Sequence, residues 1–96
     1  MENKEETAAS FSDFLFWLAT MAAVQFGDIP DPATGRPIEP NLVGAGHLIE
    51  VVAMLQEKTA GNLSADESTL IDSLLYDLRM RFVDAQGGQK RIILEP

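Results

Sequence analysis

Residues 10–26 read SFSDFLFWLATMAAVQF, and this segment determines which kinds of fold the chain can adopt. Ser10 and Asp13 have the spacing of a helix-capping pair, and Gly27 stands where helices commonly end in a left-handed residue. One side of the predicted helix is apolar at helical spacing; it carries Phe11, Phe14, Leu15, Leu18, Met21, Ala22 and Phe26. The segment therefore predicts a helix over about 10–26 with a complete core-facing stripe.

The opposite side of this helix is also apolar and carries a single charge, Asp13. Its residues keep helical spacing; they are Phe16, Trp17, Thr20, Ala23 and Val24. A helix that is apolar all round has to be buried all round. Three interpretations stay open: self-association, cover by another part of the same chain, and binding of an unidentified protein partner or a membrane. We favour a homo-oligomer, and among homo-oligomers a dimer, because symmetric dimers are the commonest assemblies.

Two further helices are predicted, each with one apolar stripe. The second spans about 41–60 with Asn41 as its N-cap, and the third spans about 64–86, opened by a Ser64–Glu67 capping box. Because only a short turn separates them, they should form an antiparallel hairpin. The fold class predicted is all-α: a single domain over 1–96, built as a three-helix unit and completed by dimerisation. The two stripes hold Leu42, Ala45, Leu48, Ile49, Val52 and Leu55, then Ile71, Leu74, Leu75, Leu78 and Phe82.

The segments outside the helices are predicted from their composition. Residues 1–9 are expected to be a flexible acidic N-terminus. Residues 27–40 hold four prolines, which forbid a helix, and are predicted to be a stiff linker that crosses over the length of a helix. Residues 87–96 are predicted to be a Gly87-Gly88 hinge followed by an apolar tail.

The tail is a second candidate docking element. The basic pair Lys90-Arg91 precedes Ile92, Ile93 and Leu94, and disordered tails seldom carry such an apolar run. The tail could pair as a strand, lie over the first helix or dock on a partner protein. The alternative is a frayed chain end.

Several short motifs occur in an order that resembles a known family. They are Gly27-Asp28-Ile29-Pro30-Asp31-Pro32, Thr34-Gly35, Met54-Leu55, Glu57-Lys58-Thr59, Gly61-Asn62-Leu63, Leu74-Leu75 and Leu78-Arg79-Met80. From about Phe14 to Val83 the chain is similar to the bacterial family catalogued as domain of unknown function 1844. The resemblance implies a bacterial, cytoplasmic, helical protein, and it implies no activity because that family is uncharacterised.

Composition narrows the classes of function. The formal net charge is −8 with only seven Lys and Arg residues, and nucleic acid and anionic lipid both bind through such basic residues. The chain has no cysteine, which excludes disulfides, thiolate metal sites and cysteine nucleophiles. The apolar run from Phe14 to Val24 is shorter than the roughly 20 residues that span a bilayer. We therefore expect a cytoplasmic protein that binds no nucleic acid and does not span a membrane.

Residues suited to chemistry are few. His47 is the only histidine, and Glu50 follows it on the same helix side. A metal site needs three or four ligands, so an exposed solvated face is the simpler interpretation, although a symmetric dimer could double the ligand count. No nucleophile elbow or glycine-rich phosphate loop occurs. No catalytic residue, cofactor or metal site is therefore predicted, and an enzyme is not expected.

The function predicted is that of a self-associating interaction, scaffold or regulatory protein. Two alternatives belong to other classes. One is a membrane-peripheral protein whose first helix lies in the interface, although no Lys or Arg flanks Trp17. The other is a small metal-binding helical bundle.

Overall fold

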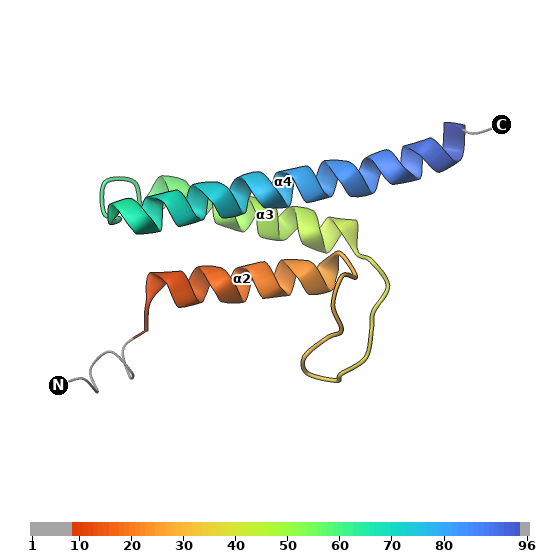
Figure 1. Ribbon diagram of the computed structural model, residues 1–96, viewed down its shortest axis with the longest axis horizontal. Helices are drawn as coiled ribbons and strands as arrows, with labels where there is room; N and C mark the ends of the chain where they lie inside the picture. Colours follow the sequence, from red (N-terminus) through yellow and green to blue (C-terminus); the bar gives the residue numbers. More distant parts are fainter. Residues whose placement is uncertain (1–8, 95–96) are drawn as a thin grey trace.

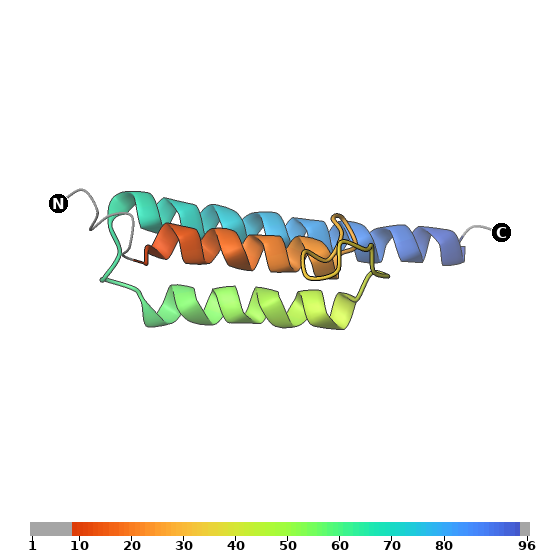
Figure 2. The same ribbon diagram turned by 90° about the horizontal axis from the view of Figure 1, so that it is seen from below.

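The computed structural model describes residues 9–94, with side chains described through residue 87. Three helices make up this part of the chain: α2 (Phe11–Gln25), α3 (Leu42–Lys58) and α4 (Ala65–Leu94). They run up, down and up, and each helix contacts the other two (Figures 1 and 2). The described residues form no strand. The predicted all-α three-helix fold, with its antiparallel hairpin of the second and third helices, is confirmed.

The helices begin where polar side chains satisfy their free N–H groups. The Ser10 hydroxyl accepts a hydrogen bond from the Asp13 amide at 2.9 Å, and the Asn41 side chain accepts one from the Gly44 amide at 2.9 Å. At the start of α4, Ser64 and Glu67 cap each other reciprocally, at 3.1 and 2.9 Å. These caps explain why the predicted starts of all three helices agree with the structure to within a residue.

The end of α4 differs from its prediction. The helix continues through Gly87 and Gly88 to Leu94, so the hinge expected at these glycines is wrong. A glycine in a helix costs only about 1 kcal/mol relative to alanine, and the flanking glutamine, lysine and arginine are good helix formers. The 30 residues of α4 therefore exceed the 17 of α3, and its last turns extend beyond the ends of both other helices (Figure 1).

The linker over residues 27–40 also differs from its prediction. Its two ends meet: the Asn41 amide donates to the Gln25 carbonyl at 2.6 Å, and a Cβ built on Gly27 would lie 3.1 Å from Pro40 Cγ. The segment is therefore a closed loop, not a crossover along a helix, and α2 and α3 are antiparallel (Figure 1). The proline pattern shows only that the segment is not helical, and it does not reveal where the chain returns.

The core lies between the three helices and is entirely apolar. No polar or charged side chain is buried in the part of the molecule whose side chains are described. An interior without polar groups offers no site for acid–base or metal chemistry, so functional groups have to be sought on the surface. The buried core residues are Leu15, Leu18, Ala22 and Phe26 of α2, Ala45 and Val52 of α3, and Ile71, Leu75 and Leu78 of α4.

Candidate interaction surface

Three aromatic side chains are exposed on the first half of α2. Phe16 is 75% exposed, Trp17 56% and Phe14 41%. The rings of Phe14 and Trp17 are stacked, with centroids 6.2 Å apart and planes inclined by 20°. We call these three residues the aromatic face.

The sequence produces this face because core and surface residues alternate within one turn of the helix. Leu15 and Leu18 are buried against α3 and α4, which fixes the rotation of α2 about its axis. At about 100° per residue, Phe16 and Trp17 then have to point away from the core. The Ser10 cap holds the first turn in place. The exposure of the aromatic face is thus set by the packing of its immediate neighbours.

The predicted surface of Phe16, Trp17, Thr20, Ala23 and Val24 is only partly exposed. Thr20 and Ala23 are half-buried, and the Thr20 hydroxyl donates to the Phe16 carbonyl at 3.0 Å. Val24 is only 4% exposed, so its assignment to the surface is wrong. The loop over 27–40 leaves and returns at this end of α2, where the Asp28 amide donates to the Ala23 carbonyl at 2.9 Å.

Phe14 is more exposed than predicted, whereas Val24 is more buried. It was assigned to the core stripe, yet it is 41% exposed. Its position lies at the margin of the buried stripe, where the side chain leaves the core and stacks on Trp17. The exposed apolar surface is therefore shifted toward the N-terminal half of α2.

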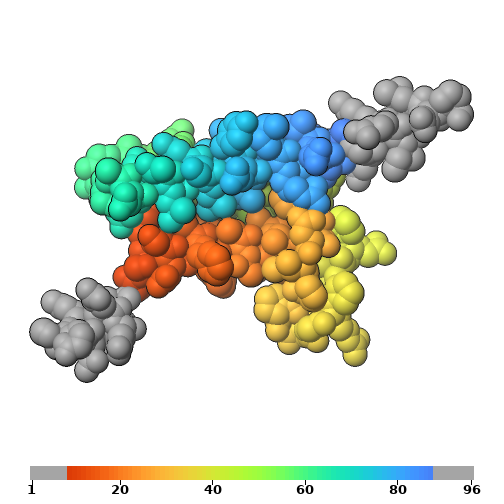
Figure 3. All heavy atoms as spheres, in the orientation of Figure 1, coloured from red at the N-terminus to blue at the C-terminus, as the bar shows by residue number. Residues whose placement is uncertain are grey.

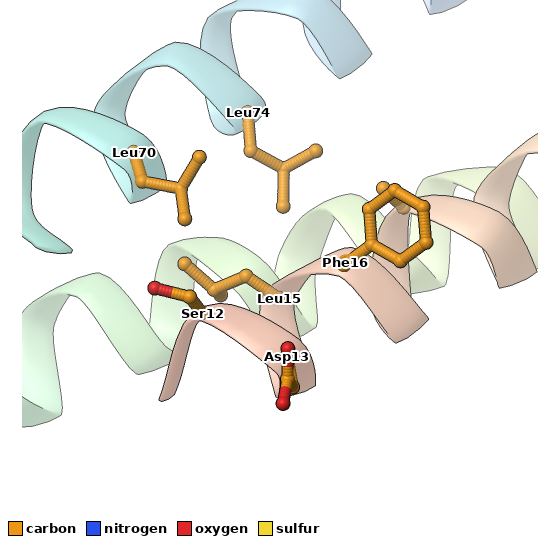
Figure 4. A pocket seen from close by; sticks show the side chains of 7 residues that line it. Ser12, Asp13, Leu15, Phe16, Leu70 and Leu74 are labelled. Atoms are coloured by element: carbon orange, nitrogen blue, oxygen red, sulfur yellow. The ribbon is translucent and has the colours of Figure 1, made fainter. Parts of the chain in front are cut away.

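A groove between α2 and α4 adjoins the aromatic face. It has a volume of about 340 Å³. In Figure 4, Leu70 and Leu74 point from α4 toward α2, and Asp13 points away from the groove. Figure 3 shows α2 and α4 lying along this face of the molecule. The lining residues are Ser12, Asp13, Leu15, Phe16 and Ala19 of α2, and Leu70 and Leu74 of α4.

Sequence reasoning missed the α4 side of this groove. Leu70 lies outside the predicted stripe and is 39% exposed. Leu74 was assigned to the core but is only half-buried. Their spacing of four residues on one helix is a local signal. That this pair lies opposite Leu15 and Phe16 depends on tertiary packing, which carries no local signal.

An ion pair joins the loop to α4. The Arg81 guanidinium donates to both carboxylate oxygens of Asp28, at 2.9 and 2.6 Å, and it lies 4.8 Å from the centre of the Phe26 ring. The hydrogen bond from Arg81 lowers the pKa of Asp28, and partial burial opposes this effect. The same hydrogen bond raises the pKa of Arg81. The two residues are 53 positions apart, and nothing in the sequence indicates that they meet.

His47 and Glu50 are both exposed on the outer side of α3. They line a shallow hollow of about 460 Å³ between α3 and α4, together with Val43 and Phe82. Among the described residues, no group of three or more histidines and carboxylates is placed to hold a metal ion.

The apolar tail residues Ile92, Ile93 and Leu94 belong to the last turn of α4. Their side chains lie outside the described residues. Their backbone shows that the segment continues a helix, which corrects the expectation of a separate tail that could pair as a strand. No helix within the described residues is both long enough and apolar enough to cross a membrane.

The fold and surface define a small three-helix bundle with an apolar interior and an exposed aromatic face. The model of the family described as domain of unknown function (DUF1844) matches residues 8–84, and the chain belongs to that family. The match includes the aromatic face and the Asp28–Arg81 pair, and it ends before the last turns of α4. Neither a curated protein nor a solved structure matches the chain.

Proposed function

We propose that this chain is a non-enzymatic interaction protein that self-associates, as a dimer, through the aromatic face of α2. The observation that carries the proposal is the exposure of three aromatic side chains, Phe14, Phe16 and Trp17, on the first half of one helix. An exposed apolar surface of this kind on a small protein often marks an interaction site. Tryptophan and phenylalanine are also enriched among interface residues.

The surroundings of the aromatic face suit a protein partner. Asp13 is the only charged residue of α2, so association would bury little charge. Fully burying a ring of this size stabilises by about 2 kcal/mol, and the stacked pair of Phe14 and Trp17 is already arranged for contact. A preformed rigid surface costs less entropy to bind than a flexible one.

A scaffold or regulatory role in a bacterial cytoplasm is part of this proposal. It is supported by the family resemblance and by the acidic composition, with a formal net charge of −8. The same charge disfavours anionic lipid and nucleic acid as partners, because both need clustered Lys and Arg.

The test is the mass of the full chain in solution, measured by size-exclusion chromatography with light scattering. The chain has a mass of 10.5 kDa, and we expect a species of twice that mass. Trp17→Glu should restore the single-chain mass. Tyr76→Glu is the matched control, because Tyr76 is 63% exposed on α4, away from the aromatic face, and it should leave the dimer unchanged. A wild-type monomer, or equal loss in both variants, would overturn the proposal.

A further inference from the structure

The last turns of α4 lie beyond the helix bundle. At 1.5 Å per residue, the 30 residues of α4 extend about 45 Å and the 17 residues of α3 about 25 Å. α3 ends and α4 begins at the 59–64 turn, so among the described residues no other helix lies beside the C-terminal end of α4 (Figures 1 and 2). The unpacked end of a helix is held only by its own hydrogen bonds and helix propensity, and Gly87 and Gly88 weaken this end. Packing against another molecule would stabilise it.

The groove between α2 and α4 is an apolar surface that no described residue of the same chain fills. Leu74 lines it, and Leu94 lies 20 residues later in the same continuous helix. The end of α4 is thus about 30 Å from its own groove and cannot fold back onto it. The first eight residues, MENKEETA, adjoin α2 but carry three glutamates and one lysine. Their composition does not suit an apolar groove.

From this placement we infer that the C-terminal end of α4 of one copy packs into the groove and onto the aromatic face of a second copy. The groove lies near the start of α2 and α4, and the projecting end lies at the opposite end of the molecule (Figure 1). Two antiparallel copies, shifted along their length, can therefore make this contact twice about one two-fold axis. Closed symmetric contacts of this kind are the commonest in homo-oligomers.

The charges at the two ends of the molecule are complementary. The groove end carries Asp13 on α2 and Asp66 and Glu67 in the first turn of α4. The segment of α4 that would dock there carries the basic pair Lys90-Arg91, followed by Ile92, Ile93 and Leu94. Opposite charges around an apolar contact fix its orientation and speed association.

The area of the aromatic face also indicates a second contact element. At roughly 200 Å² for each aromatic side chain, its exposed fractions amount to roughly 350 Å². A stable dimer of standard size buries about 800 Å² on each partner. Two aromatic faces packed only on each other would fall well short of that area. Docking of each α4 end adds the groove and the helix end to the buried surface.

This inference rests on the proposed self-association, and the experiment separates the two. The tail variant carries Ile92→Gln, Ile93→Gln and Leu94→Gln together, because glutamine removes the apolar surface and preserves helix propensity. The face variant is Trp17→Glu. Trp17 is exposed and lies outside the core, and circular dichroism checks that both variants fold. We expect each variant alone to be monomeric by light scattering.

Mixing the two variants gives the decisive result. In the inferred dimer, the tail variant still offers an intact face and the face variant an intact tail, so an equimolar mixture recovers one of the two contacts. We expect heterodimers in the mixture at concentrations where each variant alone is monomeric. A tail variant that dimerises like the wild type would overturn the inference and leave the proposed function standing. A wild-type monomer would overturn both.

Cross-linking provides a second readout that does not depend on the strength of a single contact. The chain has no cysteine, so Ser12→Cys at the groove and Gln89→Cys near the end of α4 introduce unique thiols. With a short bifunctional thiol reagent, we expect the two variants to cross-link to each other far more than either does to itself. Preferential linking of Ser12→Cys chains to one another would show face-to-face packing and contradict the inference.

Discussion

Arg81 acts on three parts of the structure at once. It binds the Asp28 carboxylate through two hydrogen bonds, it lies over the Phe26 ring, and it belongs to α4. Phe26 is part of the core, so the contact ties the loop that follows α2 to the third helix. The sequence does not predict this ion pair, because each residue alone looks like an ordinary surface charge.

We expect Arg81→Ala to destabilise the fold by about 1 kcal/mol, because a bidentate exposed ion pair and a cation–π contact are each worth a fraction of that amount. The free energy of unfolding from urea titration measures this. Arg79→Ala is the control, since Arg79 is exposed on the same helix. Equal losses in the two variants would show that the contact with Asp28 and Phe26 contributes nothing specific.

The effect of pH on this ion pair follows from the lowered pKa of Asp28. The hydrogen bond from Arg81 lowers the pKa of Asp28 in the folded state, so the ionised carboxylate stabilises the fold above the ordinary aspartate pKa of about 3.9. That contribution is lost as the pH falls through the lowered pKa. We expect Asp28→Asn to lower Tm at about pH 7, and we expect the difference from the wild type to shrink as the pH falls into the acid range. Both groups are more than one-third exposed, so the difference will be small. A gap that widened in acid would have the wrong sign.

At the scale of the elements, the sequence predicts helix starts better than helix ends. Ser10, Asn41 and Ser64 are caps whose chemistry is local, and all three are confirmed. The predicted end of α4 is wrong because glycine occurs both at the ends of helices and inside them. Gly27 and Gly61 have positive φ of 79° and 86° and do end helices, whereas Gly87 is helical. Only the backbone conformation distinguishes these cases.

That distinction predicts opposite effects for two alanine substitutions. A Cβ added at Gly87 or at Gly61 would meet nothing within 4 Å, so space does not decide the outcome. Gly87→Ala should stabilise the protein by up to about 1 kcal/mol, because alanine favours the helix. Gly61→Ala should destabilise it by about 1 kcal/mol, because φ is +86°. Thermal unfolding measures both. Destabilisation by Gly87→Ala would mean that α4 does not continue as a helix in solution.

At the scale of the whole molecule, the sequence predicts that the first helix has more apolar residues than one core stripe needs. It does not predict which of them stay exposed. The first helix was expected to carry a second stripe over Phe16, Trp17, Thr20, Ala23 and Val24. The structure leaves only Phe16 and Trp17 well exposed and buries Val24. Packing within the chain thus accounts for the far end of the stripe. The N-terminal half of the stripe is exposed. The predicted crossover of residues 27–40 did not indicate which half of the stripe would be buried.

A dimer that covers the exposed half makes stability depend on protein concentration. Association with a second copy stabilises the native state by mass action. A tenfold rise in concentration should therefore raise Tm by about 3–5 °C for a dimer of this size. Trp17→Glu should unfold at a temperature independent of concentration, and Tyr76→Glu should behave like the wild type. If the wild-type Tm were also constant, the native state would be a monomer. In that case the aromatic face would be exposed in solution and free to bind a different partner.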